Sequence, residues 1–490
     1  MGSPDAMGAD VDPDELALPA DVHAFVRKLR AGSRGEHGRF FRERGPVLVA
    51  RAPGRLDVMG GIADYSGATV CELPLAEAAL VGLCWRDDAL VRVRTVAADA
   101  LAPEVAVELS DLVGEREPPD YAALRERLRR RADEAWAAYV LGAFSVLSRE
   151  RGVRLERGAD LLLDSSVPLG KGVSSSAAIE VASLLALAAA ADVELEGYEL
   201  ALLGQIVENQ VVGAPCGLMD QLTAALGQEG ELLCIRCQDR SEPRALPIPP
   251  AVHFMGIDSG VRHAVSGASY SDVRAAAFMG YRIVADLLGL TMRSRGGGQV
   301  EIEDPQHGGW LCNIPPSLFR ARFVEHLPET LGGAEFLSRY GGTTDRATRV
   351  DPRRSYAVRA ATAHPVEEEH RVRTFVELLA GECGPAGLEL CGELMYQSHA
   401  SYSRCGLGSE ATDELLELAR AAGPERGVYG AKITGGGSGG TVAFLAHGER
   451  GAENVRAIAA EFGRRHGFQP AVFAGSSPGA MSVPVLCVER

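Results

Sequence analysis

The alternation of apolar and polar positions along this 490-residue chain predicts strands and helices in mixed order. Between residues 45 and 100, Val- and Leu-rich runs broken by Gly and Asp predict strands. From 121 to 148, apolar residues recur three and four apart, which predicts helix. The same reasoning predicts strands at 158–167, 231–237, 251–260 and 482–489, and helices at 175–191 and 199–213. This order indicates a mixed α and β architecture.

Breaks in the pattern predict how the chain is divided. The stretch "EPRALPIPP", residues 242–250, interrupts it and places a boundary between a first half, 21–245, and a second, 246–490. Residues 292–355 are rich in Gly, Pro and Arg and predict an insertion in the second half, with short helices at 315–327 and 333–341. The first twenty residues resemble a tag remnant and a disordered lead.

Composition and charge narrow the possible partners. Apolar residues make up 46% and charged residues 24% of the chain, as in folded proteins. A net charge of −16 argues against nucleic acid or an anionic membrane as a partner. The most apolar segment, 174–196, contains Glu180 and is too short between charges to span a bilayer. With no signal-peptide pattern at the N-terminus, we expect a cytoplasmic protein.

The ten cysteines are scattered, mostly within apolar runs. This pattern predicts reduced thiols rather than a disulfide framework. Cys234 and Cys237 have CxxC spacing, but no second cysteine or histidine pair stands nearby to complete a zinc site. A metal or redox role for this pair is therefore not favoured.

The stretch "PLGKGVSSSAA", residues 168–178, carries the strongest chemical signal. A strand ends, two glycines allow a tight turn, and three serines open a helix. Backbone N–H groups at such a helix start can hold phosphate oxygens, and serine hydroxyls can bind Mg²⁺ or phosphate. The segment is no Walker loop, because it lacks GxxxxGK[ST]. An ordinary serine cap is the alternative.

Two further segments carry candidate chemistry. "KITGGGSGG", residues 432–440, has five glycines between strand-like runs, and we interpret it as a second phosphate-facing loop rather than a flexible linker. "APCGLMDQ" places Asp220 near a predicted helix start. A carboxylate there can orient or deprotonate a hydroxyl nucleophile, although a lone Asp is more often a helix cap.

Five ordered segments resemble the GHMP sugar and metabolite kinases, and within them the galactokinase branch. They are "GRLDVMGGIADYSG", "VPLGKGVSSSAAIEVA", "GAPCGLMDQ", "SGVRHAVSGASY" and "ITGGGSGGTVAF", and the similarity covers roughly residues 45–490. "WAAYVLG" and "RAATAHPVEEE" also match. The resemblance implies an α+β fold of two domains, with an N-terminal domain like ribosomal protein S5 domain 2 and a C-terminal ferredoxin-like α/β sandwich. The active site would lie in the cleft between the domains.

The resemblance also implies ATP and Mg²⁺ as cofactors and assigns roles by position. Asp220 would be the catalytic aspartate, and Arg55 would lie near the reacting hydroxyl and lower its pKa. Ser176 and Glu208 would hold Mg²⁺. The implied sugar contacts are Gly61, Ile62, Asp64, Gly217, Arg262, Tyr270 and Gly436. The implied ATP contacts are Gly170, Lys171, Gly172, Val173, Ser174, Ser175, Ser176, Gly435, Gly437 and Ser438.

Two positions depart from the family. Lys171 occupies a loop position that is often small, and could add positive charge near the phosphates or point into solvent. Galactokinases have Glu-His where this chain has Gly61-Ile62, and there the pair lines the pocket end that receives the hexose 6-hydroxyl. A buried carboxylate without its hydroxyl partner is costly, so a sugar lacking that group favours its loss. L-Arabinose has galactose's configuration at carbons 2, 3 and 4 without the exocyclic CH₂OH.

Other stretches are similar to the kinase portion of plant L-arabinokinases. They include "LPETLGGAEFLSRYG" inside the 292–355 segment, "LMYQSHASYSRCGLGSEATD" and "GSSPGA". We therefore expect a kinase that makes L-arabinose 1-phosphate from L-arabinose and ATP. A galactokinase or a broad C1 kinase that also accepts a uronic acid is the alternative within the same class. A galactokinase-like sugar sensor with little catalysis is the alternative outside it.

Overall fold

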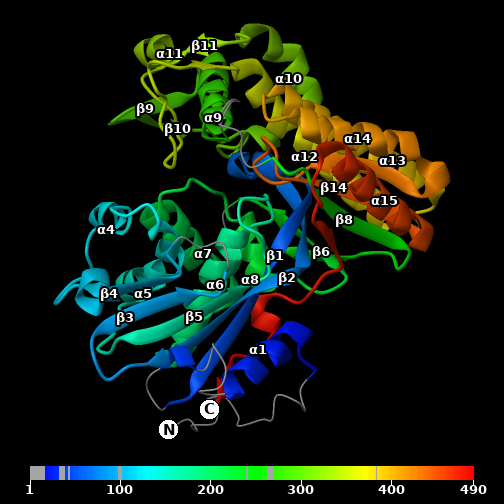
Figure 1. Ribbon diagram of the computed structural model, residues 1–490. Coiled ribbons are helices and arrows are strands. Elements are labelled where there is room, and N and C mark those ends of the chain that lie inside the picture. The colour runs from blue at the N-terminus through cyan, green and yellow to red at the C-terminus, as the bar shows by residue number, and fades with distance from the viewer. Residues whose placement is uncertain are drawn as a thin grey trace, which may run out of the picture.

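The computed structural model describes residues 17–31, 39–41, 45–97, 102–238, 241–261, 270–381 and 383–489. Two sheets organise these residues: an eight-stranded sheet in the lower half of Figure 1, and a four-stranded sheet to its upper right. The strands of the large sheet run β16-β1-β2-β5-β3-β4, with β6 pairing β2 and β7 pairing β6. They are β1 (Val47–Met59), β2 (Thr69–Trp85), β3 (Leu90–Thr95), β4 (Glu104–Glu108), β5 (Ala159–Ser165), β6 (Glu231–Arg236), β7 (Arg244–Pro247) and β16 (Leu486–Val488).

Strands β1 and β2 form the centre of the large sheet. They pair antiparallel almost throughout, and β1 is buried at nearly every position, so it resembles a core strand more than an alternating one. The long strand β2 pairs with β5 at one end and β6 at the other. The β3–β5 pair is parallel, which requires a crossover, and helix α5 (Ala138–Arg151) lies in that connection.

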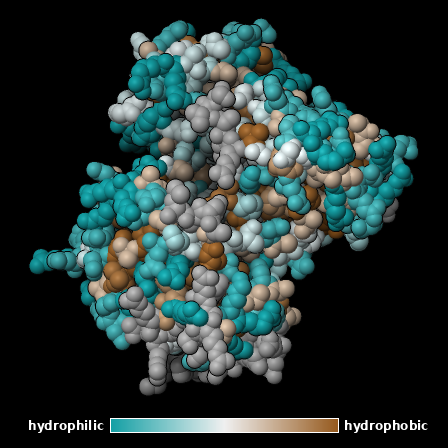
Figure 2. All heavy atoms as spheres, in the orientation of Figure 1, coloured by the Kyte–Doolittle hydropathy of each residue, from teal (hydrophilic) through white to brown (hydrophobic). Residues whose placement is uncertain are grey.

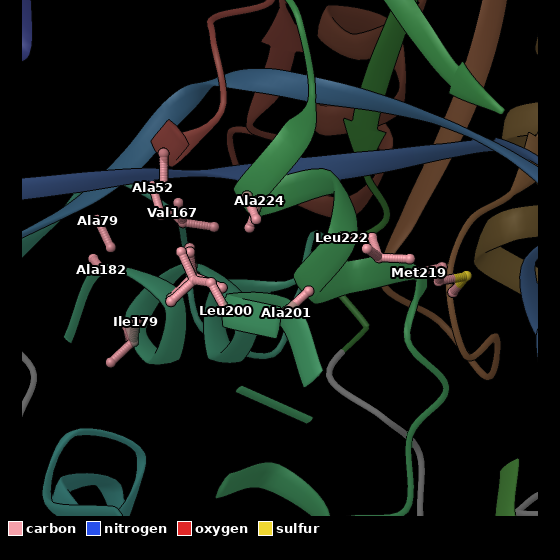
Figure 3. Packing of buried hydrophobic residues seen from close by; sticks show 14 of the residues in the cluster. Ala52, Ala79, Val167, Ile179, Ala182, Leu200, Ala201, Met219, Leu222 and Ala224 are labelled. Carbon is pink, nitrogen blue, oxygen red and sulfur yellow. The ribbon is translucent and has the colours of Figure 1, made fainter. Parts of the chain in front are cut away.

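Helices cover one face of this sheet. Helix α6 is apolar on all sides and buried along most of its length, as expected of a helix at the centre of a core. Figure 3 shows Ala182 of α6 facing Ala79 of β2, with residues of α7 and α8 in the same layer. The helices of this half are α1 (Ala20–Arg30), α3 (Leu109–Val113), α4 (Tyr121–Leu128), α5 (Ala138–Arg151), α6 (Ser175–Ala190), α7 (Gly197–Ile206) and α8 (Met219–Leu226).

The smaller sheet has the order β13-β14-β8-β15 and is antiparallel throughout. Its strands are β8 (Val252–Asp258), β13 (Val428–Ile433), β14 (Thr441–His447) and β15 (Val472–Ala474). Long helices pack against it and beside it (Figure 1): α12 (Val358–Ala380), α13 (Pro385–Arg404), α14 (Glu410–Ala422) and α15 (Gly448–His466).

The smaller sheet and its helices form the second unit of the molecule. The segment between β8 and α12 of this unit has its own apolar core. It includes the hairpin of β9 (Thr291–Gly296) and β10 (Gln299–Glu303), the paired β11 (Leu331–Gly332) and β12 (Ser355–Tyr356), and helices α9 (Tyr270–Leu287), α10 (Pro316–Arg322) and α11 (Gly333–Tyr340). The short helices predicted at 315–327 and 333–341 are therefore present as α10 and α11. Their core also contains Ile62, Tyr65 and Tyr402, so this segment packs against the 61–67 loop.

Three features differ from the expected pattern. The boundary expected at 245/246 falls inside β7, which completes the first sheet. The last strand, β16, returns to pair with β1, so the end of the chain belongs to the first sheet rather than the second. The helix predicted at 199–213 ends as α7 at Ile206 and continues as a π-helical turn, Val207–Val212. Among the described residues, no helix is long and apolar enough to cross a membrane.

Candidate active site

A cavity of about 340 Å³ lies where the two units meet, and Figure 2 shows the surface hollowed between the part that carries α9–α11 and the part that carries α4–α7. Residues from β1, α6, α8, α9 and the 434–440 loop converge on it. Fourteen of the sequence-predicted site residues line this cavity: Arg55, Ile62, Asp64, Gly170, Gly172, Ser174, Ser175, Ser176, Glu208, Gly217, Asp220, Tyr270, Gly435 and Gly436.

The loop between β5 and α6 has the geometry of an anion-binding turn. Gly170, Gly172 and Ser174 all have positive φ, at 70°, 73° and 55°, and the non-glycine Ser174 is unusual there. The loop leads into the N-terminus of the 16-residue helix α6, where backbone N–H groups are unpaired by the helix. Within the described structure, the buried hydroxyls of Ser174 and Ser438 have no hydrogen-bond partner. Such orphaned donors fit phosphate oxygens.

Arg55 and Asp220 form the charged pair at the centre of the cavity. Arg55 Nε donates to Asp220 Oδ1 at 2.9 Å, and Nη2 lies 2.8 Å from the same oxygen in an ion pair. Arg55 Nη1 donates to the carbonyl of Gly172 at 2.8 Å. Burial lowers the pKa of Arg55, but the negative charges of Asp220, Glu72 and Asp57 together raise it by more, so the net shift is upward. The guanidinium therefore stays charged and joins the phosphate-type loop to the carboxylate.

Glu208 lies on the π-helical turn behind Ser176. The Ser176 hydroxyl donates to its carboxylate, and the amide of Gln221 donates to it at 2.7 Å. Burial and the nearby Asp220 raise the pKa of Glu208 to about 7. A hydroxyl and a carboxylate beside a phosphate-type loop form an oxygen donor set that suits Mg²⁺. Single π turns inside helices often occur at functional sites.

Asp64 and Gly217 face each other across the cavity wall. A Cβ at Gly217 would lie 1.7 Å from Asp64 Oδ2, so only glycine leaves room for this carboxylate. Burial raises the pKa of Asp64 to about 7 although Arg274 opposes the shift. Tyr270 lines the same wall, with its ring 5.8 Å from that of Tyr65.

Ile62 lines the cavity but Gly61 does not. Gly61 lies behind it at a φ of +44°, and its N–H donates to Asp57 Oδ1 at 3.0 Å. The hydroxyl of Tyr402 occupies the space beside its Cα. The predicted apolar side chain is therefore present at the cavity as Ile62, while Gly61 makes room for a neighbour rather than for a ligand.

A buried ion pair joins the two units beneath the cavity. Lys432 of β13 donates to Asp57 Oδ2 of β1 at 2.6 Å, and both side chains are fully buried. The same oxygen accepts the N–H of Gly435 at 3.1 Å, while the N–H of Asp57 donates to Thr434 Oγ1. These bonds hold the 434–440 loop against the first sheet.

The other predicted site residues that the structure describes lie outside the cavity lining. Lys171 neither faces the cavity nor extends into solvent, because its ammonium pairs with Asp258 of β8 at 2.7 Å. Val173 is buried, and its carbonyl accepts the N–H of Arg55. Gly437 and Ser438 lie in the 434–440 loop but are not among the lining residues. Arg262 lies outside the described residues.

Several residues of the site were not predicted from the sequence. Tyr139 lines the cavity from α5, within the segment "WAAYVLG" that matched the family without an assigned role. Asp57, Lys432 and Tyr402 act beneath the lining. Asp57 stands inside the quoted segment "GRLDVMGGIADYSG", residues 54–67, so its charge in an apolar strand was a usable signal. Tyr402 gave none, since it is one aromatic residue within a helical pattern.

Known proteins are similar to this chain in sequence and in fold. The model of the GHMP kinase N-terminal domain matches residues 138–228, and that of the C-terminal domain matches residues 386–465. An L-arabinokinase from Arabidopsis thaliana is 39% identical over 96% of this chain, which spans only 49% of that protein. A galactokinase from Chloroflexus aggregans is 34% identical over 87% of this chain and 91% of its own length.

The fold comparison agrees with the α+β prediction. The crystal structure of Lactococcus lactis galactokinase complexed with galactose superposes with a TM-score of 0.69 at 19% identity, covering 94% of this chain and 99% of that one. This likeness and the two domain matches confirm the predicted fold class. The chain therefore belongs to the GHMP kinase family, among the relatives of galactokinases and L-arabinokinase.

Proposed function

We propose that this protein transfers the γ-phosphoryl group of ATP to the anomeric C1 hydroxyl of a monosaccharide, and that the sugar is L-arabinose. The observation that carries the proposal is the cavity itself, in which Asp220 and Arg55 lie between the loop before α6 and the wall formed by Asp64, Gly217 and Ile62. The 39% identity to an L-arabinokinase supports the choice of sugar.

Ile62 supports a pentose over a hexose. If the substrate were a hexose, its buried 6-hydroxyl would need a hydrogen-bond partner. An aliphatic side chain such as Ile62 provides none. Ile62 is 1% exposed and offers only apolar atoms to the cavity. The same wall disfavours a uronic acid, because a carboxylate loses hydration there without gaining a partner.

In the proposed reaction, Asp220 accepts the proton of the C1 hydroxyl as that oxygen attacks the γ-phosphorus. The bond from this phosphorus to the bridging oxygen of ADP breaks, and ADP leaves. Arg55 stabilises the carboxylate and the developing negative charge on the attacking oxygen. Asp64 and Tyr270 orient the ring. Phosphoryl transfer demands little covalent chemistry of a protein, so positioning and charge neutralisation supply most of the rate.

The phosphates of ATP would rest on the 170–176 loop and the N-terminus of α6, where Ser174 presents a free hydroxyl. Ser176 and Glu208 would hold Mg²⁺, which neutralises charge on the phosphates. The 434–440 loop, fixed by Asp57, borders the cavity from the other unit through Gly435 and Gly436. The residues present therefore fit both groups.

A coupled ADP-release assay tests the proposal. With ATP and Mg²⁺, we expect the highest kcat/KM for L-arabinose among L-arabinose, D-galactose, D-fucose, D-glucuronate and D-galacturonate. A clear preference for D-galactose would overturn the choice of sugar. If the wild-type protein binds a sugar and ATP but releases ADP no faster than the Asp220→Ala variant, a sensor is indicated instead.

A further inference from the structure

A side chain at position 61 and the hydroxyl of Tyr402 would occupy the same space. This space lies behind the cavity wall formed by Ile62, Asp64 and Gly217, here called the sugar wall. A Cβ built on Gly61 would lie 1.7 Å from the hydroxyl oxygen of Tyr402 and 2.6 Å from Asp57 Oδ2. No real Cβ approaches an oxygen that closely, so the tyrosine at 402 requires glycine at 61. The φ of +44° adds a second reason against a side chain there.

The hydroxyl of Tyr402 also joins two parts of the cavity lining. It accepts the N–H of Ile62 at 2.8 Å and donates to the carbonyl of Gly435 at 3.0 Å. Ile62 and Gly435 both line the cavity, from different units of the molecule. One side chain of α13 therefore sets the spacing between the sugar wall and the second glycine-rich loop.

The ring of Tyr402 has no freedom to move away. It is fully buried, with the Lys432 ammonium 5.3 Å from its centre and the His364 ring edge-on at 5.2 Å. Gly437 lies against its other side, where a Cβ would stand 3.2 Å from Tyr402 Cδ1. The position of the hydroxyl is therefore determined by close packing.

We propose that Tyr402 is a positioning residue that determines sugar specificity: its hydroxyl fills the space of a side chain at position 61 and binds the backbone of Ile62 and Gly435. Both hydrogen bonds of the hydroxyl are used within the protein. A hexose 6-hydroxyl would therefore find this end of the site filled and without a free donor or acceptor, whereas a pentose needs neither. This inference rests on the proposed sugar kinase activity.

The first test is Tyr402→Phe, which removes one oxygen atom. It frees the N–H of Ile62 and the carbonyl of Gly435 to meet a sugar hydroxyl. We expect the ratio of kcat/KM for D-galactose to that for L-arabinose to rise about tenfold, the scale of one lost or gained hydrogen bond. The KM for L-arabinose should rise about fivefold, by the same reasoning, with kcat changing much less.

Tyr396→Phe is the matched control, since Tyr396 lies on the same helix, is also buried and packs against Arg420 away from the cavity. It should change neither the ratio nor the KM. A ratio in Tyr402→Phe within twofold of the wild-type value, in a protein that melts normally, would overturn the proposal. If the wild-type enzyme turns over neither D-galactose nor L-arabinose, the proposed function fails. The kcat/KM ratio is then measured for another hydroxymethyl hexose and another pentose that the enzyme does turn over.

A double-mutant cycle keeps the test decisive if Tyr402→Phe is unstable. Gly61→Ala should lower the melting temperature strongly in the wild-type background and less in the Tyr402→Phe background, because the clashing oxygen is gone. Backbone strain at Gly61 is the same in both and cancels from the coupling. Additive shifts in melting temperature would show that the two positions do not share space, and would overturn the proposal without reference to any sugar.

Discussion

The chemistry proposed for this site depends on individual charged residues, and their surroundings influence their charge. Arg55 is almost completely buried, whereas the side chain of Asp220 keeps 17% of its surface exposed toward the cavity. This asymmetry holds a permanent cation behind a carboxylate that can still reach a ligand. Asp64 differs, because burial rather than an ion pair dominates its surroundings and raises its pKa.

Asp220→Asn should lower kcat by about three orders of magnitude, as expected when a general base is lost. The amide is nearly the same size, and Glu72 at 3.2 Å still compensates the charge of the buried Arg55, so the melting temperature and the KM for the sugar should change little. Single-turnover ADP release measures the chemical step directly. Retention of a tenth or more of the wild-type kcat would remove Asp220 from the proposed role.

The sugar KM should depend on pH through Asp64, whose pKa is about 7. Above pH 7 its carboxylate can accept charge-assisted hydrogen bonds from sugar hydroxyls, and below it the protonated group binds them less well. We expect kcat/KM for the sugar to fall as the pH drops from 8 to 6. The raised pKa also means that Asp64 favours the unliganded fold most in acid, and that this contribution disappears as the pH rises through about 7.

Asp64→Asn separates this effect from Glu208, whose pKa is also raised to about 7. In this variant kcat/KM should be low but should lose the part of the pH dependence that belongs to sugar binding. An unchanged pH profile in Asp64→Asn would assign the dependence to another group.

At the scale of elements, strands β1 and β13 are joined by the buried pair of Asp57 and Lys432. A buried pair contributes little compared with apolar residues, but removing one partner leaves a charge without compensation. We expect Lys432→Met to reduce the free energy of unfolding by about 3–5 kcal/mol, measured by urea titration. Lys28→Met is the control: it breaks the exposed pair with Asp164, at 3.0 Å, and should cost less than about 1 kcal/mol. Equal effects would contradict the role assigned to Asp57.

The turn into α6 allows a second test at this scale. Ser174→Ala and Ser174→Gly both remove the orphaned hydroxyl, so both should raise the KM for ATP about tenfold if that hydroxyl meets a phosphate. Only glycine relieves the φ of 55° and should stabilise the protein relative to alanine by about 1 kcal/mol. A normal KM for ATP in both variants would show that the hydroxyl is not used.

At the scale of the whole molecule, the last described strand returns to the first sheet. β16 covers the edge of β1, and the preceding tail is attached where Ser477 donates to the carbonyl of Leu75 and the N–H of Gly479 donates to Gly227. Removing residues 476–490 should expose the edge of β1 and cause aggregation on size-exclusion chromatography. Met481→Ser, which changes an exposed side chain in the same tail, should leave the protein monodisperse or in its wild-type assembly.

Local patterns in the sequence were sufficient for most of the elements and for the outline of the site. Strands such as β1, β2 and β5 and helices such as α6 follow from apolar runs and from the Gly, Asp and Ser residues that bound them, since an element buried on all sides needs apolar residues at nearly every position. The glycine-rich loops and Asp220 stand out because a tight turn, or a charge in apolar surroundings, can be recognised from a few neighbouring residues. The ordered motifs then identified the kinase family, which the comparisons confirm.

Only the tertiary structure decided which of these residues share one cavity. Lys171 could not be assigned from its neighbours, because its partner Asp258 lies on a strand of the other unit. The pairing of β16 with β1 could not be predicted, because the sequence of a three-residue strand does not indicate which sheet edge it pairs with. The meaning of Gly61 depends on Tyr402, a residue far away in the sequence whose hydroxyl takes the missing side chain's place. Contacts between distant segments leave no local period, and that is why the sequence by itself determined the elements and the chemistry while packing determined the specificity of their arrangement.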